Sequence, residues 1–466
     1  MKVPATLLLA ATLLTGCASF SSDGGFAPIE QTAKQRLGKD LQRASTDAHA
    51  ESIDRRVAAL LAQPLTADDA VQVALLNNRG LQATYQELGI GEAERVQAGR
   101  LANPGFSFSR LQRGGEIELE RGLHVNLARL LVLPQIQQME ARRFAQTQGM
   151  VTTRVLALAT DTRKAYVNAV AAEETVRYRR QVMQAADAGA ELARRMAQVG
   201  NFSKLQQARE QGFYADAALN LAHAQQAQRA TRERLTRLLG LWGEQAAFKL
   251  PERLADLPPA AIDQPEIERS AMAQRLDVQG ARLAAEQTAA NLGLTRTTRW
   301  INVLELGRLH NSSNEAPTQR GWELGLELPL FDWGDARVKR AEAVYMQTLH
   351  QAAETAINAR SEVREAYANY RSAYDIARHH RDEIVPLRKQ IAEENVLRYN
   401  GMLIGVFELL ADARSQIASV SAAIDALRDF WLAQADLEMA LIGKPNLAAS
   451  AASAGPAMAA DGGAAH

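Results

Sequence analysis

The sequence contains little cysteine, few aromatic residues and no net charge. Its 466 residues include one cysteine, so no disulfide bond can form within the chain. Its 53 basic residues balance 53 acidic ones, which argues against a nucleic-acid-binding protein, because such proteins carry a basic excess. Aromatic residues make up 5% of the chain, as expected for alanine-rich helical rods. These absences favour an elongated helical protein.

Sequence motifs of catalysis and metal binding are absent as well. We find no HExxH, Walker loop, GxSxG or clustered Cys/His set. The adjacent pair His379 and His380 falls in a helical stretch, where neighbouring side chains point about 100° apart and are poorly placed to chelate a metal. We expect His380 to be a partly buried position between helices instead. The sequence therefore predicts a protein that is not an enzyme, with no cofactor and no metal site.

Long helices dominate the chain, most clearly at 341–441, which predicts two helices with a break near Gly401. Apolar residues recur there at alternating spacings of three and four, which is typical of a coiled-coil seam. Most of the first seam is alanine, so the partner helix must approach closely, and this arm would be about 90 Å long. The first seam comprises Tyr345, Leu349, Ala352, Ala356, Ala359, Val363, Ala366, Tyr370, Ala373 and Ala377.

The same pattern occurs earlier in the chain. Residues 163–168 (RKAYVN) match 364–369 (REAYAN), and Gly200 matches Gly401 at the same offset. When the seam positions of the second half are shifted back along the chain by this offset, they fall on apolar residues except at Gln148 and Thr162. Internal repeats of this kind indicate a duplicated architecture. We predict a first repeat at 61–250 and a second at 266–443, joined by a proline-rich linker at 251–265.

The N-terminus predicts export. Residues 1–16 form a signal segment with a charged start at Lys2 and an apolar run too short to span a bilayer. The run ends in Leu-Thr-Gly-Cys, which resembles the bacterial lipoprotein signal and implies that Cys17 is the lipidated first residue of the mature protein. The following Ala18 implies outer-membrane sorting by the same resemblance. The alternative is an ordinary signal peptide with an incidental cysteine.

Other segments are assigned from local patterns. Residues 17–60 are polar and mixed, which predicts an extended arm with some helix. Thr66, with Asp69 three residues on, predicts the N-cap of a helix that covers 70–97. The Ala-, Gly- and Ser-rich residues 444–466 predict a disordered tail.

Two β-hairpins, at 104–131 and 299–330, are predicted from a change of hydrophobic period to two. Apolar residues alternate with glutamates at 116–127, where Arg121 breaks the pattern, and again at 322–330. Four strands could form a small soluble sheet packed on the helices. If they lie in a membrane, several chains must combine their strands, because open sheet edges cannot face lipid.

Taken in order, these features resemble the TolC-like outer-membrane efflux factor family, in its lipoprotein branch. The resemblance is carried by the lipoprotein signal, the tandem halves, the sequence LPLFD at 328–332 and the tip sequence RYNG at 398–401. It implies a mainly α-helical fold with a membrane β-barrel. In a homotrimer, four strands per chain would form a 12-stranded barrel and long helical hairpins a 12-helix tunnel.

The resemblance also implies a function and partners. The trimer would be the exit duct of a tripartite pump, with a periplasmic adaptor and an inner-membrane transporter, and would pass small molecules or metal ions. One alternative is a type I protein-secretion duct. Another is a coiled-coil lipoprotein scaffold without a pore.

Three groups of candidate site residues follow. The polar strand faces would line an acidic barrel lumen, unless some of these residues lie on the solvated outer rim: Glu116, Glu118, Glu120, Glu323 and Glu327. The hairpin tips would dock the adaptor, unless they pack only within the trimer: Gly200, Asn201, Phe202, Gly401, Met402 and Leu403. Glu408 and Asp412 share one helix face and would form a periplasmic gate, unless that face is the solvated exterior.

Overall fold

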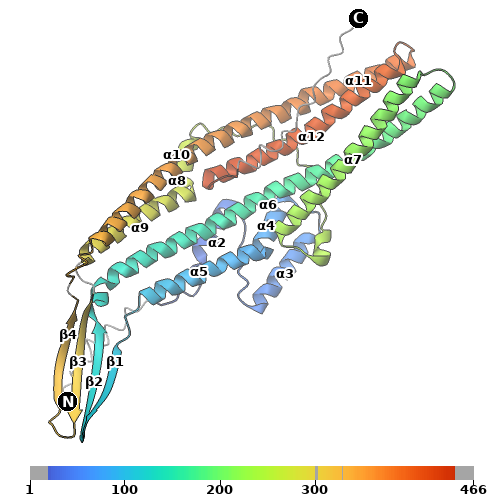
Figure 1. The fold of residues 1–466 in the computed structure, drawn as a ribbon. Coiled ribbons are helices and arrows are strands. Elements are labelled where there is room, and N and C mark those ends of the chain that lie inside the picture. The colour runs from blue at the N-terminus through green and yellow to red at the C-terminus, as the bar shows by residue number, and fades with distance from the viewer. Residues whose placement is uncertain (1–18, 300–302, 328, 447–466) are drawn as a thin grey trace. The chain divides into compact units, whose positions relative to one another are not determined.

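The computed structural model describes residues 19–299, 303–327 and 329–446 (Figure 1). The signal segment, Cys17 and the tail beyond Asn446 lie outside the described residues. None of the described helices is both long enough and apolar enough to cross a membrane. The elements in chain order are α2 (Ala27–Leu37), α3 (Asp47–Leu61), α4 (Ala67–Asn77), α5 (Arg79–Ala98), β1 (Gly105–Arg113), β2 (Glu116–Asn126), α6 (Leu127–Gln198), α7 (Lys204–Leu239), η2 (Gly243–Ala247), α8 (Ile267–Gln274), α9 (Leu276–Thr298), β3 (Leu304–Ser313), β4 (Gln319–Leu326), α10 (Asp335–His379), η3 (His380–Ile384), α11 (Val385–Asn400) and α12 (Val406–Ile442).

The described chain divides into two compact units. The first takes the described residues of 19–32, 83–152 and 276–357 and contains the four strands. The second takes residues 33–82, 153–275 and 358–446 and contains both hairpin tips. Each unit therefore combines segments of both predicted repeats, because the long helices α6 and α10 each run through both units.

Two predictions for the N-terminal part need correction. The arm at 17–60 is largely helical where it is described, because α3 buries Ile53 and Val57, one helical turn apart, in a hydrophobic core. The single helix predicted at 70–97 is two helices. Asn78 ends α4 with an extended backbone, and its side-chain oxygen accepts a hydrogen bond from the Leu81 N–H, so it also begins α5. The predicted cap at Thr66 is present, with a full capping box to Asp69.

The four strands form one antiparallel sheet in the order β1-β2-β3-β4. Phe106 lies opposite Leu123, Leu123 opposite Arg308, and Arg308 opposite Trp322, so one row of side chains crosses all four strands. The strands end at Asn126 and Leu326, earlier than the predicted hairpin limits of 131 and 330. The first difference arises because α6 already begins at Leu127.

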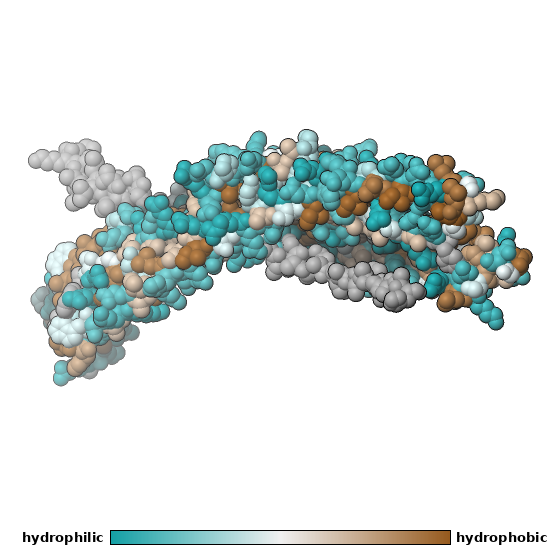
Figure 2. Space-filling view, turned by 90° about the horizontal axis from the view of Figure 1, so that it is seen from above, coloured by the Kyte–Doolittle hydropathy of each residue, from teal (hydrophilic) through white to brown (hydrophobic). Residues whose placement is uncertain are grey.

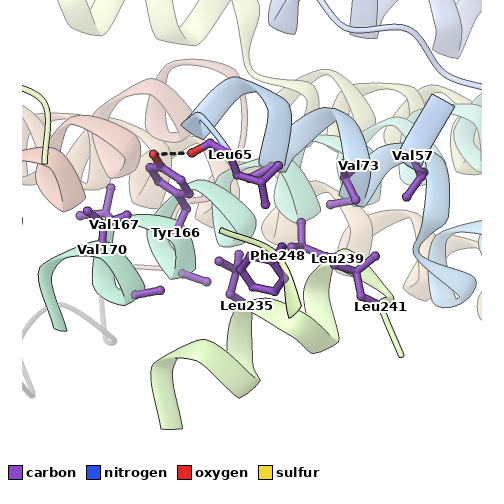
Figure 3. Packing of buried hydrophobic residues seen from close by; sticks show 14 of the residues in the cluster. Val57, Leu65, Val73, Tyr166, Val167, Val170, Leu235, Leu239, Leu241 and Phe248 are labelled. Carbon is purple, nitrogen blue, oxygen red and sulfur yellow. Dashed lines mark hydrogen bonds between the residues drawn. The ribbon is translucent and has the colours of Figure 1, made fainter. Parts of the chain in front are cut away.

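The core of the second unit lies between α3, α4, α6, α7 and the segment that follows α7 (Figure 3). Leu235, Leu239 and Phe248 are almost fully buried in it. The Tyr166 hydroxyl donates a hydrogen bond to the Leu65 carbonyl oxygen at 3.0 Å. Burial raises the pKa of Tyr166 to about 12, so its phenol stays protonated and keeps donating. This bond ties the start of the α4 segment to the long helix α6.

The predicted seam of the second half is buried in its central part. Ala359, Val363, Ala366 and Tyr370 are at most 1% exposed, and Tyr370 packs against Phe430 of α12 with ring centroids 5.6 Å apart. The helix then widens into a π-helical turn, η3, just before Pro386. Proline has no N–H to donate, and the N–H of Val385 instead reaches back five residues to the carbonyl of His380. The π-helical turn is where the rod accommodates the proline, and His380 is partly buried in it, as predicted.

Candidate functional site: the sheet faces and the hairpin tips

One face of the sheet is acidic. Cross-strand partners share a face, and the register places Glu116, Glu118, Glu120 and Glu323 together, with His124 between them. The Glu323 carboxylate lies 3.9 Å from His124 Nδ1. Glu327 continues the same alternation just after β4. The structure adds Glu305, which lies opposite Asn126 on this face.

Sequence reasoning missed Glu305 because the facing of 300–309 was ambiguous without the register. Its face becomes clear only from the register, because Glu305 lies two residues from Gly307, the cross-strand partner of Glu323. The acidic face is therefore larger than the sequence alone indicated.

The opposite face of the sheet is apolar and exposed. Phe106, Trp322 and Leu324 are 65–69% exposed, although they are among the largest apolar side chains of the chain. Further exposed members of the same face are Phe108, Leu123, Val125 and Leu326. A contiguous apolar surface of this kind marks a contact with another molecule or a membrane. The outer strands β1 and β4 also each keep one unpaired edge within the described sheet.

The first hairpin tip turns between α6 and α7. Gly200 adopts a left-handed backbone with φ of 80°, which glycine tolerates without strain, and the Asn201 N–H bonds to the Met196 carbonyl at 2.8 Å. Ser203 then begins α7 with a capping box. Asn201 is exposed, whereas Phe202 is half-buried. Val199 is 71% exposed beside the turn.

The second tip does not turn at a left-handed glycine. Gly401 has an ordinary φ of −79°, and the left-handed residue is Met402, with φ of 60°. Non-glycine residues rarely adopt this conformation, because the Cβ atom crowds the following carbonyl oxygen. Met402 is 92% exposed and Leu403 is 77% exposed. Apolar residues gather at the surface of this end of the molecule (Figure 2).

The predicted gate residues differ in their surroundings. Glu408 is exposed in the first turn of α12, where the positive end of the helix dipole favours an acid. Asp412 is half-buried and accepts a hydrogen bond from the Asn395 side chain of α11. Arg194 and Arg195 pair with Glu191 on their own helix, at 2.9 and 2.8 Å. Asp412 therefore faces into its own hairpin, while Glu408 remains on the surface.

An ion pair that sequence reasoning missed joins the two hairpins. Glu210 of α7 is 2% exposed, and its carboxylate lies 2.7 Å from the guanidinium of Arg414 on α12. Arg414 also lies over the Phe213 ring, 4.4 Å from its centroid. Nothing in the sequence pattern marks this pair, because its partners are about 200 residues apart. The pair fixes α12 against the first hairpin near the tips.

Comparison with known proteins supports the fold. No family model matches the chain, and no curated protein matches its sequence. Among solved structures, CusC, described as forming a transmembrane channel, is 17% identical over 81% of this chain and 92% of its own, with a TM-score of 0.67. The outer membrane protein VceC of Vibrio cholerae is 15% identical over 81% of this chain and 96% of its own, with a TM-score of 0.66. The Campylobacter jejuni outer membrane channel CmeC is 17% identical over 87% of this chain and 91% of its own, also with a TM-score of 0.66. The chain therefore has the fold of these outer-membrane channels, as its resemblance to the TolC-like family predicted.

Proposed function

We propose that the chain is one subunit of a homotrimeric outer-membrane channel that serves as the passive exit duct of a tripartite efflux system. The observation that carries the proposal is the four-stranded sheet, which combines an exposed apolar face with two open edges in a fold shared with outer-membrane channels. In lipid, both edges must be paired by strands from other copies. Three copies would supply twelve strands, which lies within the range of known membrane barrels.

The two faces of the sheet support this orientation. The apolar face would meet lipid, and the acidic face would line the lumen with rings of carboxylates from Glu116, Glu118, Glu120, Glu323 and Glu327. Such rings favour cations over anions. The duct would conduct small molecules or metal ions. A transporter in the inner membrane would supply the energy for this transport. Lipid on Cys17 would add a second attachment to the outer membrane.

The helical end would carry the partner contacts. We propose that Val199, Met402 and Leu403 dock a periplasmic adaptor, because apolar side chains this exposed at a turn are covered in a working assembly. Threefold repetition of Glu408 and Asp412 near this end would gather like charges into a gate that responds to cations.

The test of the channel is conductance in planar bilayers, compared between two neighbouring substitutions. Leu324→Arg places a charge on the apolar face, which costs about 2–4 kcal/mol near the bilayer midplane, so insertion and conductance should be lost. Gly325→Arg places the same charge on the acidic face beside Glu305 and should leave insertion intact. No conductance from the wild-type protein would favour the scaffold alternative. Export of a large polypeptide would favour the protein-secretion duct.

A further inference from the structure

Basic side chains interrupt the apolar face of the sheet on the side nearer the strand-connecting turns. Arg121 of β2 lies opposite His310 of β3, which lies opposite Arg320 of β4. One row closer to the helices, Arg308 lies over the Trp322 ring, 5.0 Å from its centroid. We call Arg121, Arg308, His310 and Arg320 the basic band.

The basic band has no counter-charge within the described sheet. The register places every described strand glutamate on the opposite face, and the one ion pair of the described strands, His124–Glu323, is also there. Identical copies joined at the sheet edges would bring no acid, because each would present the same side chains on this face. A negative counter-charge for the basic band would therefore have to come from another molecule.

The band encloses a shallow hollow of about 360 Å³. Three arginines and His310 line it, and Phe106 and Leu123 form its apolar wall. The guanidinium group is planar and donates two parallel hydrogen bonds to a phosphate. The hollow thus offers convergent phosphate donors beside an apolar surface, a combination that matches an amphipathic anion.

The position of the band along the strands identifies the source of that anion. Closer to the helices the face is purely apolar, with Val125, Leu306 and Leu324 in one row. Leu326 lies six residues from Arg320, about 20 Å along the strand. The basic band therefore lies toward the turn end of an apolar surface long enough for acyl chains.

We propose that the basic band binds the anionic, phosphate-bearing headgroup of a membrane lipid whose acyl chains lie along the apolar face. The proposal rests on the membrane insertion of the sheet that the proposed function requires. Within a trimer the band would repeat three times around the barrel and would fix the depth of the barrel in the membrane.

The test is native mass spectrometry of the full-length protein in detergent micelles, with phosphatidylglycerol, phosphatidylcholine or inorganic phosphate as the added probe. An arginine at a membrane surface contributes about fivefold to the binding of an anionic lipid. Arg121→Gln should weaken phosphatidylglycerol binding about fivefold, and the triple variant Arg121→Gln, Arg308→Gln and Arg320→Gln on the order of 100-fold. Arg113→Gln is the matched control, since Arg113 lies on the acidic face opposite Glu116, and it should change little.

The outcomes separate this proposal from the channel itself. Equal phosphatidylglycerol binding by the wild type and the triple variant, or equal loss in the Arg113 control, would overturn the lipid site. Tight binding of inorganic phosphate alone would identify a free-anion site instead. A triple Arg→Lys variant, which keeps the charge, should retain intermediate lipid binding and excludes misfolding as the cause of loss. Conductance in phosphatidylcholine bilayers should be the same for the wild type and the triple variant. A wild type that binds phosphatidylglycerol through these arginines but does not conduct would refute the channel and leave the lipid site standing.

Discussion

Replacement of Glu362 by alanine should destabilise the protein far more than loss of a typical ion pair. Its carboxylate lies 2.6 Å from the guanidinium of Arg275, a side chain only 1% exposed at the break between α8 and α9. Arg275 also donates to the carbonyl oxygens of Ala359 on α10 and Ala440 on α12, at 3.4 and 3.3 Å. The pair therefore joins three helices in the second unit.

The size of the expected loss in stability depends on which member of the ion pair remains in the protein. Glu362→Ala removes the carboxylate that lies 2.6 Å from a buried guanidinium, and breaking a buried ion pair in this way costs about 3–5 kcal/mol. Because the Glu362 side chain is 18% exposed, water can partly replace it, so we expect about 3 kcal/mol. Arg275→Met instead leaves an acid that can reach water. The double variant should therefore be more stable than Glu362→Ala alone.

The assay is guanidinium unfolding followed by the helical circular dichroism signal. The matched control is Glu268→Ala, which removes an exposed ion pair to Arg364 between the same two helices, α8 and α10. Exposed pairs contribute about 0.2–1 kcal/mol, so the control should change stability by less than about 1 kcal/mol. The reasoning fails if the Glu362 and Glu268 variants lose the same stability, or if Arg275→Met does not rescue Glu362→Ala.

Four further predictions concern the proposed channel. Cys17→Ser should lose radiolabelled fatty acid in cells while trimers still insert, and retained label would refute the lipidation. Gly200→Ala should cost about 1 kcal/mol in thermal or chemical unfolding, because its φ is 80°, whereas Gly401→Ala should be nearly neutral at φ of −79°. Glu323→Gln should reduce cation preference in reversal-potential measurements, and an unchanged preference would place this residue outside the lumen. Asp412→Ala should raise single-channel conductance or abolish block by divalent cations, and no change in either would argue against a gate there.

Features set by local periodicity could be predicted from the sequence. The seam at Ala359, Val363 and Ala366 was visible as a three-four spacing and is buried in the structure. The alternation of glutamate with apolar residues in β2 predicted two chemically different faces, which the register confirms. These predictions hold because the positions that share a helix stripe or a strand face are fixed by the geometry of one segment.

Details of the turns were less predictable. The glycine at 401 suggested the site of the left-handed residue, but Met402 takes that conformation. The Met402 N–H bonds to Tyr399 and the Leu403 N–H to Arg398, at 3.0 and 2.8 Å. The backbone conformation of this turn is therefore determined by all of its hydrogen bonds together. The conformational preference of glycine at one position does not determine it.

The sequence by itself determined the long helices and the four strands, since each depends on spacings within one segment. The tertiary structure alone decided which charges meet. Arg121 was visible only as a break in an alternating pattern, and strand register brought it beside His310 and Arg320. Helix packing likewise brought Glu210 to Arg414 and Arg275 to Glu362. Such pairings join residues far apart in the chain, so their geometry depends on how whole elements pack, and no local periodicity encodes it.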